Sequence, residues 1–190
     1  MQHVVILGSS HVARLEKLVV NKKIHINPAI RGTTVSFVGA GGMSFAQFMS
    51  SRGKDMQNRV RDEKPDITVL VMGANDLDQP TGPAVATVIE SALAVIQWLH
   101  SIGSTVAVMP LFLRRKGFRG GKHPGRGDYA DMYENFNSFL SGTLQSSGCA
   151  AYGRFVPLTE GDLQDDGVHL NDHGYAKLLQ KIKQSILRAK

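Results

Sequence analysis

Cysteine is almost missing from this sequence, since Cys149 is the single cysteine among 190 residues. One cysteine excludes an internal disulfide framework and is typical of proteins from reducing compartments. Long hydrophobic runs are missing too, because no apolar stretch approaches the roughly 20 residues that a membrane-spanning helix needs. A chain of this length buries a sizeable core without disulfides. We therefore expect a protein with no membrane span that is held together by core packing.

We see no internal repeat and no linker in the sequence, and we expect no targeting leader in it. Its first ten residues, MQHVVILGSS, carry neither a basic segment nor a small-residue cleavage site, and we interpret them as a core strand. Together with the lone cysteine, this favours a cytoplasmic location. Nothing in the composition divides the chain, so we expect residues 1–190 to form one domain. The net charge of +6 weakly favours anionic partners.

Short apolar runs alternate along the chain with segments of helical periodicity. Strands are predicted at residues 3–7, 33–38, 67–72, 105–109 and 151–156, and helices at 12–20, 83–99, 129–144 and from 171 onwards. Continuous apolar runs suit strands that are buried on both faces of a parallel sheet. This order predicts an α/β three-layer sandwich, and it leaves the stretch 110–127 without regular structure.

Polar and glycine residues follow the predicted strands where ligand sites of open parallel sheets gather, at the carboxyl ends. Ser10 follows the first strand, a glycine-rich turn with Gly42 follows the second, and Asn75 follows the third. Asp166 and His169 stand before the last helix. Acyl transfer requires a nucleophile, a base, a group that orients the base, and donors to an oxyanion. These residue types meet that requirement.

Four segments resemble the sequence blocks of the SGNH (GDSL-type) hydrolase superfamily, in the order of that family. They are GSSH at 8–11, GAGGMS at 39–44, GAND at 73–76 and DGVH at 166–169. The resemblance implies a flavodoxin-like α/β/α fold with a five-stranded parallel sheet, hydrolysis of acyl esters or lipids, and no metal or organic cofactor.

The same resemblance implies a role for each matching residue. Ser10 matches the nucleophile and, through its N–H, the first oxyanion donor, with Gly42 and Asn75 as the other two donors. Gly41 is the alternative to Gly42, one residue out of register. Asp166 and His169 match the acid and the base of a Ser-His-Asp triad, in which the carboxylate fixes the tautomer of the ring.

The first block departs from the usual Gly-Asp-Ser of the family, because Ser9 stands in the place of the acid. That acid is not a triad member, so the triad stays complete, and Ser10 is chosen because it holds the third position. The segments GSSHVARL and DGVHLNDHGY also resemble the SGNH esterase domains of first-open-reading-frame proteins in some animal LINE retrotransposons.

Each segment also has a purely structural interpretation. Ser9 and Ser10 could cap the following helix, and the glycines and Asn75 could form ordinary turns. Asp166 and His169 could be a surface pair, or could bind zinc together with His173. The four segments in the expected order at one sheet edge favour the triad, with Asn171 or Asp172 capping the last helix.

The segment 114–126 is rich in basic residues and contains no acid. Arg114, Arg115, Lys116 and Arg119 are its candidate anion contacts. It could be a solvated, disordered loop, which we favour, a lid over the site, or a contact for nucleic acid or anionic lipid. Two functions follow: a serine esterase for short, acetyl-type acyl esters, or a catalytically weak module that binds lipid or nucleic acid through this loop.

Overall fold

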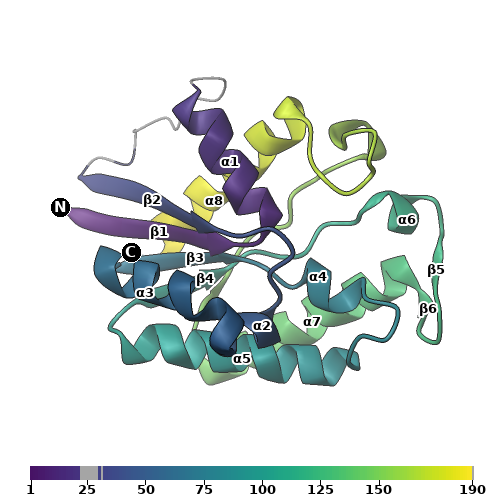
Figure 1. Cartoon of the computed structure of the whole chain (residues 1–190), viewed down its shortest axis with the longest axis horizontal. Helices are drawn as coiled ribbons and strands as arrows, with labels where there is room; N and C mark the ends of the chain where they lie inside the picture. The colour runs from purple at the N-terminus through teal and green to yellow at the C-terminus, as the bar shows by residue number, and fades with distance from the viewer. Residues whose placement is uncertain (22–29, 31, 190) are drawn as a thin grey trace.

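Five parallel strands form the central sheet in the order β2-β1-β3-β4-β7, within the residues that this computed structural model describes, namely 1–21, 30 and 32–189 (Figure 1). The strands are β1 (Gln2–Gly8), β2 (Thr33–Gly39), β3 (Ile67–Val71), β4 (Thr105–Val108) and β7 (Ala151–Tyr152). The first four begin and end within one residue of the predicted runs, and β7 is shorter than predicted. The predicted parallel sheet is confirmed.

Both faces of the sheet are buried, which explains why its strands are apolar almost throughout. In β1, Val4 and Ile6 pack into the core on one face, and Val5 and Leu7 pack into the core on the other. All residues of β3 are buried as well. Continuous apolar strands of this kind are typical of parallel sheets that helices cover on both sides.

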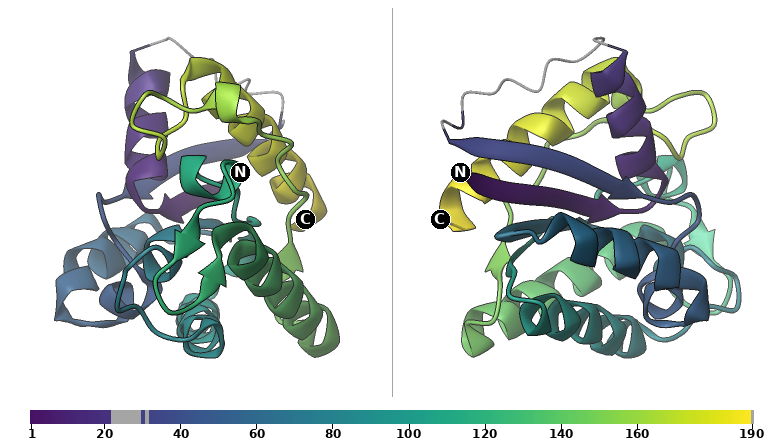
Figure 2. Two further views of the ribbon diagram at one scale, coloured as in Figure 1. Left: turned by 90° about the vertical axis from the view of Figure 1, so that its right-hand side faces the viewer. Right: turned by 60° about the vertical axis from the view of Figure 1, so that its left-hand side comes forward.

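Helices form a layer on each side of the sheet (Figure 2). One layer contains α1 (Ser10–Val20) and α8 (Asp172–Ala189). The other contains α2 (Phe45–Met49), α3 (Lys54–Glu63), α5 (Val85–Ser101) and α7 (Tyr129–Ser147). The predicted three-layer α/β/α sandwich is therefore confirmed.

The sequence did not predict α2 and α3, because α2 has only five residues and α3 has few apolar residues. In α3 only Met56 and Val60 are buried, which is too few to form a recognisable stripe. The described residues also form the short helical turns η1 (Ser51–Gly53), α4 (Ala74–Leu77) and η2 (Glu160–Asp162).

The prediction that residues 110–127 lack regular structure was wrong, and so was the solvated, disordered loop favoured for residues 114–126. This segment contains α6 (Arg115–Phe118) and an antiparallel pair of strands, β5 (Lys122–His123) and β6 (Gly127–Asp128). Its order comes from side chains that turn inwards, since Arg114 and His123 are both buried. The ring nitrogens of His123 each lie 2.8 Å from a backbone carbonyl oxygen, of Pro124 and of Gln79.

Three loops start side by side at the carboxyl edge of the sheet. Gly8 at the end of β1 pairs with Gly39 of β2 and with Val71 of β3. The chain continues from these points into α1, into the turn before α2, and into α4. Neither these helices nor any other in the described ranges combines the length and apolar character that crossing a membrane requires.

Candidate active site

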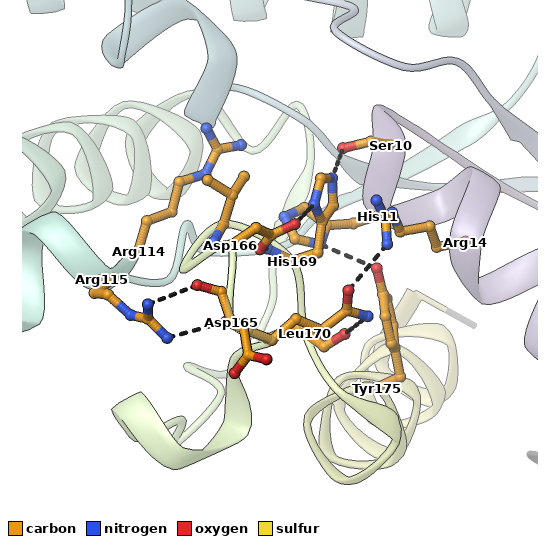
Figure 3. Close-up of polar contacts among 12 residues, drawn as sticks. Ser10, His11, Arg14, Arg114, Arg115, Asp165, Asp166, His169, Leu170 and Tyr175 are labelled. Atoms are coloured by element: carbon orange, nitrogen blue, oxygen red, sulfur yellow. Dashed lines mark hydrogen bonds and ion pairs between the residues drawn. The ribbon is translucent and has the colours of Figure 1, made fainter.

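Ser10 is the first residue of α1, and its hydroxyl faces His169 (Figure 3). The distance from Ser10 Oγ to His169 Nε2 is 3.1 Å. The turn from β1 into α1 requires glycine, because a Cβ on Gly8 would lie 2.3 Å from the Val71 carbonyl oxygen. Ser9 is the N-cap residue, but its side chain makes no capping hydrogen bond. The serine pair therefore brings a hydroxyl to a histidine and does not cap the helix through its side chains.

Asp166 completes a hydrogen-bonded chain on the far side of the imidazole. Its Oδ2 lies 2.6 Å from His169 Nδ1, and its Oδ1 accepts hydrogen bonds of 2.9 Å from the backbone N–H groups of Val168 and His169. Partial burial raises the pKa of Asp166, but these hydrogen bonds outweigh it and hold the pKa below its ordinary value. An ionised Asp166 keeps a proton on Nδ1 and so leaves Nε2 free to accept one from Ser10.

The triad loop, residues 163–170, closes on itself through backbone contacts. Leu163 and Leu170 form an antiparallel bridge, and Gln164 N–H donates to the His169 carbonyl over 2.7 Å. Gly167 stands in the left-handed region at φ +67°, where a side chain is strained. A Cβ there would also lie 2.5 Å from the Cβ of Arg115. Glycine at this position thus permits both the turn and the close approach of α6.

Two arginines tie the triad loop to neighbouring helices, as Figure 3 shows. Arg14 of α1 donates to the side chain of Gln164 over 3.1 Å, and the Gln164 amide donates to the Leu170 carbonyl. Arg115 of α6 donates to the carbonyls of Asp165 and Gln164 over 2.6 and 3.2 Å. The loop that carries Asp166 and His169 is therefore held from two sides.

Two of the predicted oxyanion donors are backbone N–H groups. Within the described part of the chain, neither Ser10 N–H nor Gly42 N–H has a hydrogen-bond acceptor. Gly42 has a φ of +70°, and the space where its Cβ would stand is open. The Ser10 N–H stands at the start of α1, where an unpaired donor is suited to binding an anion.

Asn75, the third predicted donor, lies in the short helix α4 and bridges two other segments. Its Nδ2 donates to the Met43 carbonyl over 3.0 Å, in the turn that carries Gly42. Its Oδ1 accepts a 3.0 Å hydrogen bond from Arg114. The structure thus brings the second and third sequence blocks into contact. Arg114 lies beside them and contacts Asn75.

The predicted anion contacts mostly have partners within the protein. Arg114 is 8% exposed and forms an ion pair with Asp78. Arg119 pairs with Glu160 at 2.9 Å, and Arg115 lies 3.4 Å from the same carboxylate. Lys116 places its Nζ 5.6 Å from the ring centre of Tyr129. These residues border a pocket of about 420 Å³ that also reaches Asp166, Gly167 and Val168.

His11, for which the sequence gives no role, is buried beneath the triad. Its ring centre lies 5.5 Å from that of His169, and the hydroxyl of Tyr175 lies 3.4 Å from its Nδ1. Burial, and then the nearby Arg114, His169 and Arg14 side chains, lower the pKa of His11 well below its ordinary value. His11 is therefore neutral beside the base.

The zinc alternative finds no matching geometry. His173 lies 3.8 Å from Asp162, and His169 is directed at Asp166 and Ser10. Within residues 1–21, 30 and 32–189, no group of three or more His, Cys, Asp or Glu side chains gathers that could hold a metal ion. Asn171 caps α8 as predicted, since its Oδ1 accepts from Gly174 N–H over 3.0 Å.

Several residues around the site could not be recognised from the sequence. They are Arg14, Asp78, Tyr133, Gln164 and Tyr175, whose hydrogen bonds reach the predicted residues or residues in contact with them. A signal existed only for Asp78, because a basic segment without acids needs a carboxylate from elsewhere if one of its arginines is buried. Contacts such as that of Arg14 with Gln164 join positions 150 residues apart and leave no local pattern.

Proteins of known structure share this fold, although no protein-family profile and no curated protein matches the sequence. A GDSL-like lipase from Bacteroides thetaiotaomicron is 16% identical, with a TM-score of 0.71 over 100% of this chain and 89% of that one. A lipase/acylhydrolase from Enterococcus faecalis is 23% identical, with a TM-score of 0.63 over 97% and 96%. The esterase EstA from Pseudoalteromonas is 14% identical, with a TM-score of 0.66 over 99% and 98%. The chain therefore has the α/β fold of the SGNH (GDSL-type) hydrolases.

Proposed function

We propose that this chain is a serine esterase that hydrolyses short, acetyl-type acyl esters through Ser10, His169 and Asp166. The observation that supports this most is the unbroken chain of hydrogen bonds, 2.6 Å from Asp166 to His169 and 3.1 Å from His169 to Ser10. The fold adds support, since it is shared with structures described as lipases and esterases, among them an acetyl xylan esterase.

In the proposed reaction, His169 Nε2 removes the proton of Ser10 as Oγ bonds to the ester carbonyl carbon. The tetrahedral oxyanion accepts hydrogen bonds from Ser10 N–H, Gly42 N–H and the Asn75 amide. His169 then passes its proton to the leaving alkoxide, and an acyl-enzyme remains. Water attacks the acyl-enzyme with the same histidine as base, which releases the acid and restores Ser10.

The binding-module alternative, with lipid or nucleic acid held by segment 114–126, has less support. Arg114, Arg115 and Arg119 all have carboxylate or carbonyl partners within the protein. Each new phosphate contact would have to compete with these pairs. The comparisons give no support to the narrower resemblance to LINE retrotransposon domains, which stays a prediction.

Hydrolysis of p-nitrophenyl acetate, butyrate and octanoate tests the proposal. We expect Ser10→Ala to lose activity, whereas the matched control Ser9→Ala, whose hydroxyl makes no capping bond, keeps it. Acetate should be the best substrate. A folded wild-type protein that hydrolyses none of the esters would refute the proposal. Activity that is lost in Ser9→Ala and kept in Ser10→Ala would assign the nucleophile to Ser9 instead.

A further inference from the structure

A buried polar network joins Asn75 to α7 through Arg114. One terminal nitrogen of the guanidinium donates to Asn75 Oδ1 over 3.0 Å, and the other pairs with Asp78 Oδ2. Tyr133 of α7 donates its hydroxyl to Asp78 Oδ1 over 2.7 Å. The side chain of Arg114 is 9% exposed and that of Asp78 is 24% exposed, so the guanidinium is largely shielded from water.

These contacts leave the Asn75 carboxamide with one orientation. A guanidinium has only donors, so the amide atom that faces Arg114 must be the oxygen. A backbone carbonyl only accepts, so the atom that faces Met43 must be the nitrogen. Rotation of the amide by 180° would place two donors against each other and two acceptors against each other. One Nδ2 hydrogen is used by Met43, and the second remains for another acceptor.

The rest of the network holds the guanidinium in place. A planar guanidinium keeps its two terminal nitrogens at a fixed angle, so pairing one of them with Asp78 also directs the other. Burial raises the pKa of Tyr133 well above its ordinary value, which keeps its hydroxyl a donor towards Asp78. Each member thus restrains the next, from α7 to α4.

We propose that Arg114 is a positioning residue, which fixes the Asn75 amide so that its second hydrogen faces the oxyanion. This inference rests on the proposed esterase function. It gives Arg114 a role other than the anion contact expected from the sequence. Arg114 does not touch the reacting atoms and acts through Asn75, so its removal should matter only while Asn75 is present.

A double-mutant cycle measures this dependence with p-nitrophenyl acetate as the probe. We expect Arg114→Met to lower kcat roughly 10-fold with little change in KM, below the 10²–10³-fold that loss of a whole oxyanion donor costs. In an Asn75→Ala background the same substitution should lower kcat less than about 2-fold, because a positioning residue has nothing left to position. Arg188→Met, an exposed arginine in the last turn of α8, is the matched control.

Two results would overturn the inference. One is an unchanged kcat in folded Arg114→Met, and the other is an equal loss of kcat in both backgrounds. If Arg114→Met does not fold, Tyr133→Phe replaces it in the cycle, with an expected decrease of about 2- to 3-fold that also disappears without Asn75. Inactive wild-type protein refutes the esterase proposal, whereas active wild type with an uncoupled Arg114 refutes the positioning role alone.

Discussion

At the scale of single residues, the chemistry of the site depends on which atom holds each proton. Asp166 shows this most clearly, because both of its oxygens are used. Oδ1 accepts from two backbone N–H groups, which leaves Oδ2 to face the imidazole. The carboxylate is thereby fixed by the loop that also carries His169, and the tautomer of the base follows from the backbone.

The substitution Asp166→Asn tests this control of the tautomer. The backbone donors would keep an amide oxygen on their side, so the amide nitrogen would face His169 Nδ1 and donate to it. Nε2 would then carry the ring proton and could not accept that of Ser10. We expect kcat/KM for p-nitrophenyl acetate to fall by about 10³–10⁴-fold in a folded protein. A loss of less than tenfold would contradict this role of Asp166.

The residues of the proposed triad and the proposed oxyanion donors were predictable, and the residues that support them were not. Ser10, Asn75 and the Asp166–His169 pair stand in short blocks whose resemblance to those of the SGNH hydrolases, in the same order, points to them. Arg114 is the opposite case, since its partners Asp78 and Asn75 lie more than 30 residues away and only the folded chain brings them together. A run of basic residues looks the same in a sequence whether its charges are solvated or paired.

At the scale of elements, the strands of the sheet could be predicted from local sequence patterns, whereas the structure of the loops could not. The strands were predictable because burial on both faces demands apolar runs. The segment 110–127 was not, because its order depends on buried side chains such as Arg114 and His123, which are polar. Some loop positions accept only glycine, because the backbone conformation or a neighbouring atom excludes a side chain. Gly167 in the triad loop is the clearest example.

We expect Gly167→Ala to damage both stability and catalysis. The left-handed backbone would cost an alanine about 1–2 kcal/mol, and the new methyl would press against Arg115, which anchors the triad loop. Urea unfolding and kcat for p-nitrophenyl acetate measure the two effects. The matched control is Gly161→Ala in η2, where a Cβ meets only Thr159 Oγ1 at 3.7 Å. Equal behaviour of the two variants would rule out the close approach of α6 as a constraint.

At the scale of the whole molecule, the sheet brings segments that are far apart in the sequence to the same edge. Ser10 and His169 are 159 positions apart, and the parallel strands deliver them to one edge. The turn that carries Gly42 depends on a different long-range contact. Asp76, in α4, accepts hydrogen bonds from Phe45 N–H at the start of α2, at 3.1 and 3.2 Å. This contact holds the second sequence block against the third.

Asp76 also makes the stability of the molecule depend on pH. Burial raises its pKa to about 6, although hydrogen bonds from the backbone of Phe45 and its neighbours oppose the shift. An aspartate in an unfolded chain has a pKa of about 3.9, so the folded protein binds this proton more tightly. The stability that Asp76 contributes is therefore fully present below about pH 4 and is lost as the pH rises through about 6.

Unfolding by urea between pH 4 and pH 8 tests this prediction in wild type and in Asp76→Asn. At about 1.4 kcal/mol for each pH unit of difference, wild type should lose roughly 3 kcal/mol relative to the variant, with most of the loss below pH 6. Asp166 has the opposite sign, because its lowered pKa removes stability only as the pH falls. Its effect is common to both proteins and cancels in the difference. Parallel stability curves for the two proteins would mean that Asp76 has the same pKa in the folded and in the unfolded chain, which would contradict the prediction.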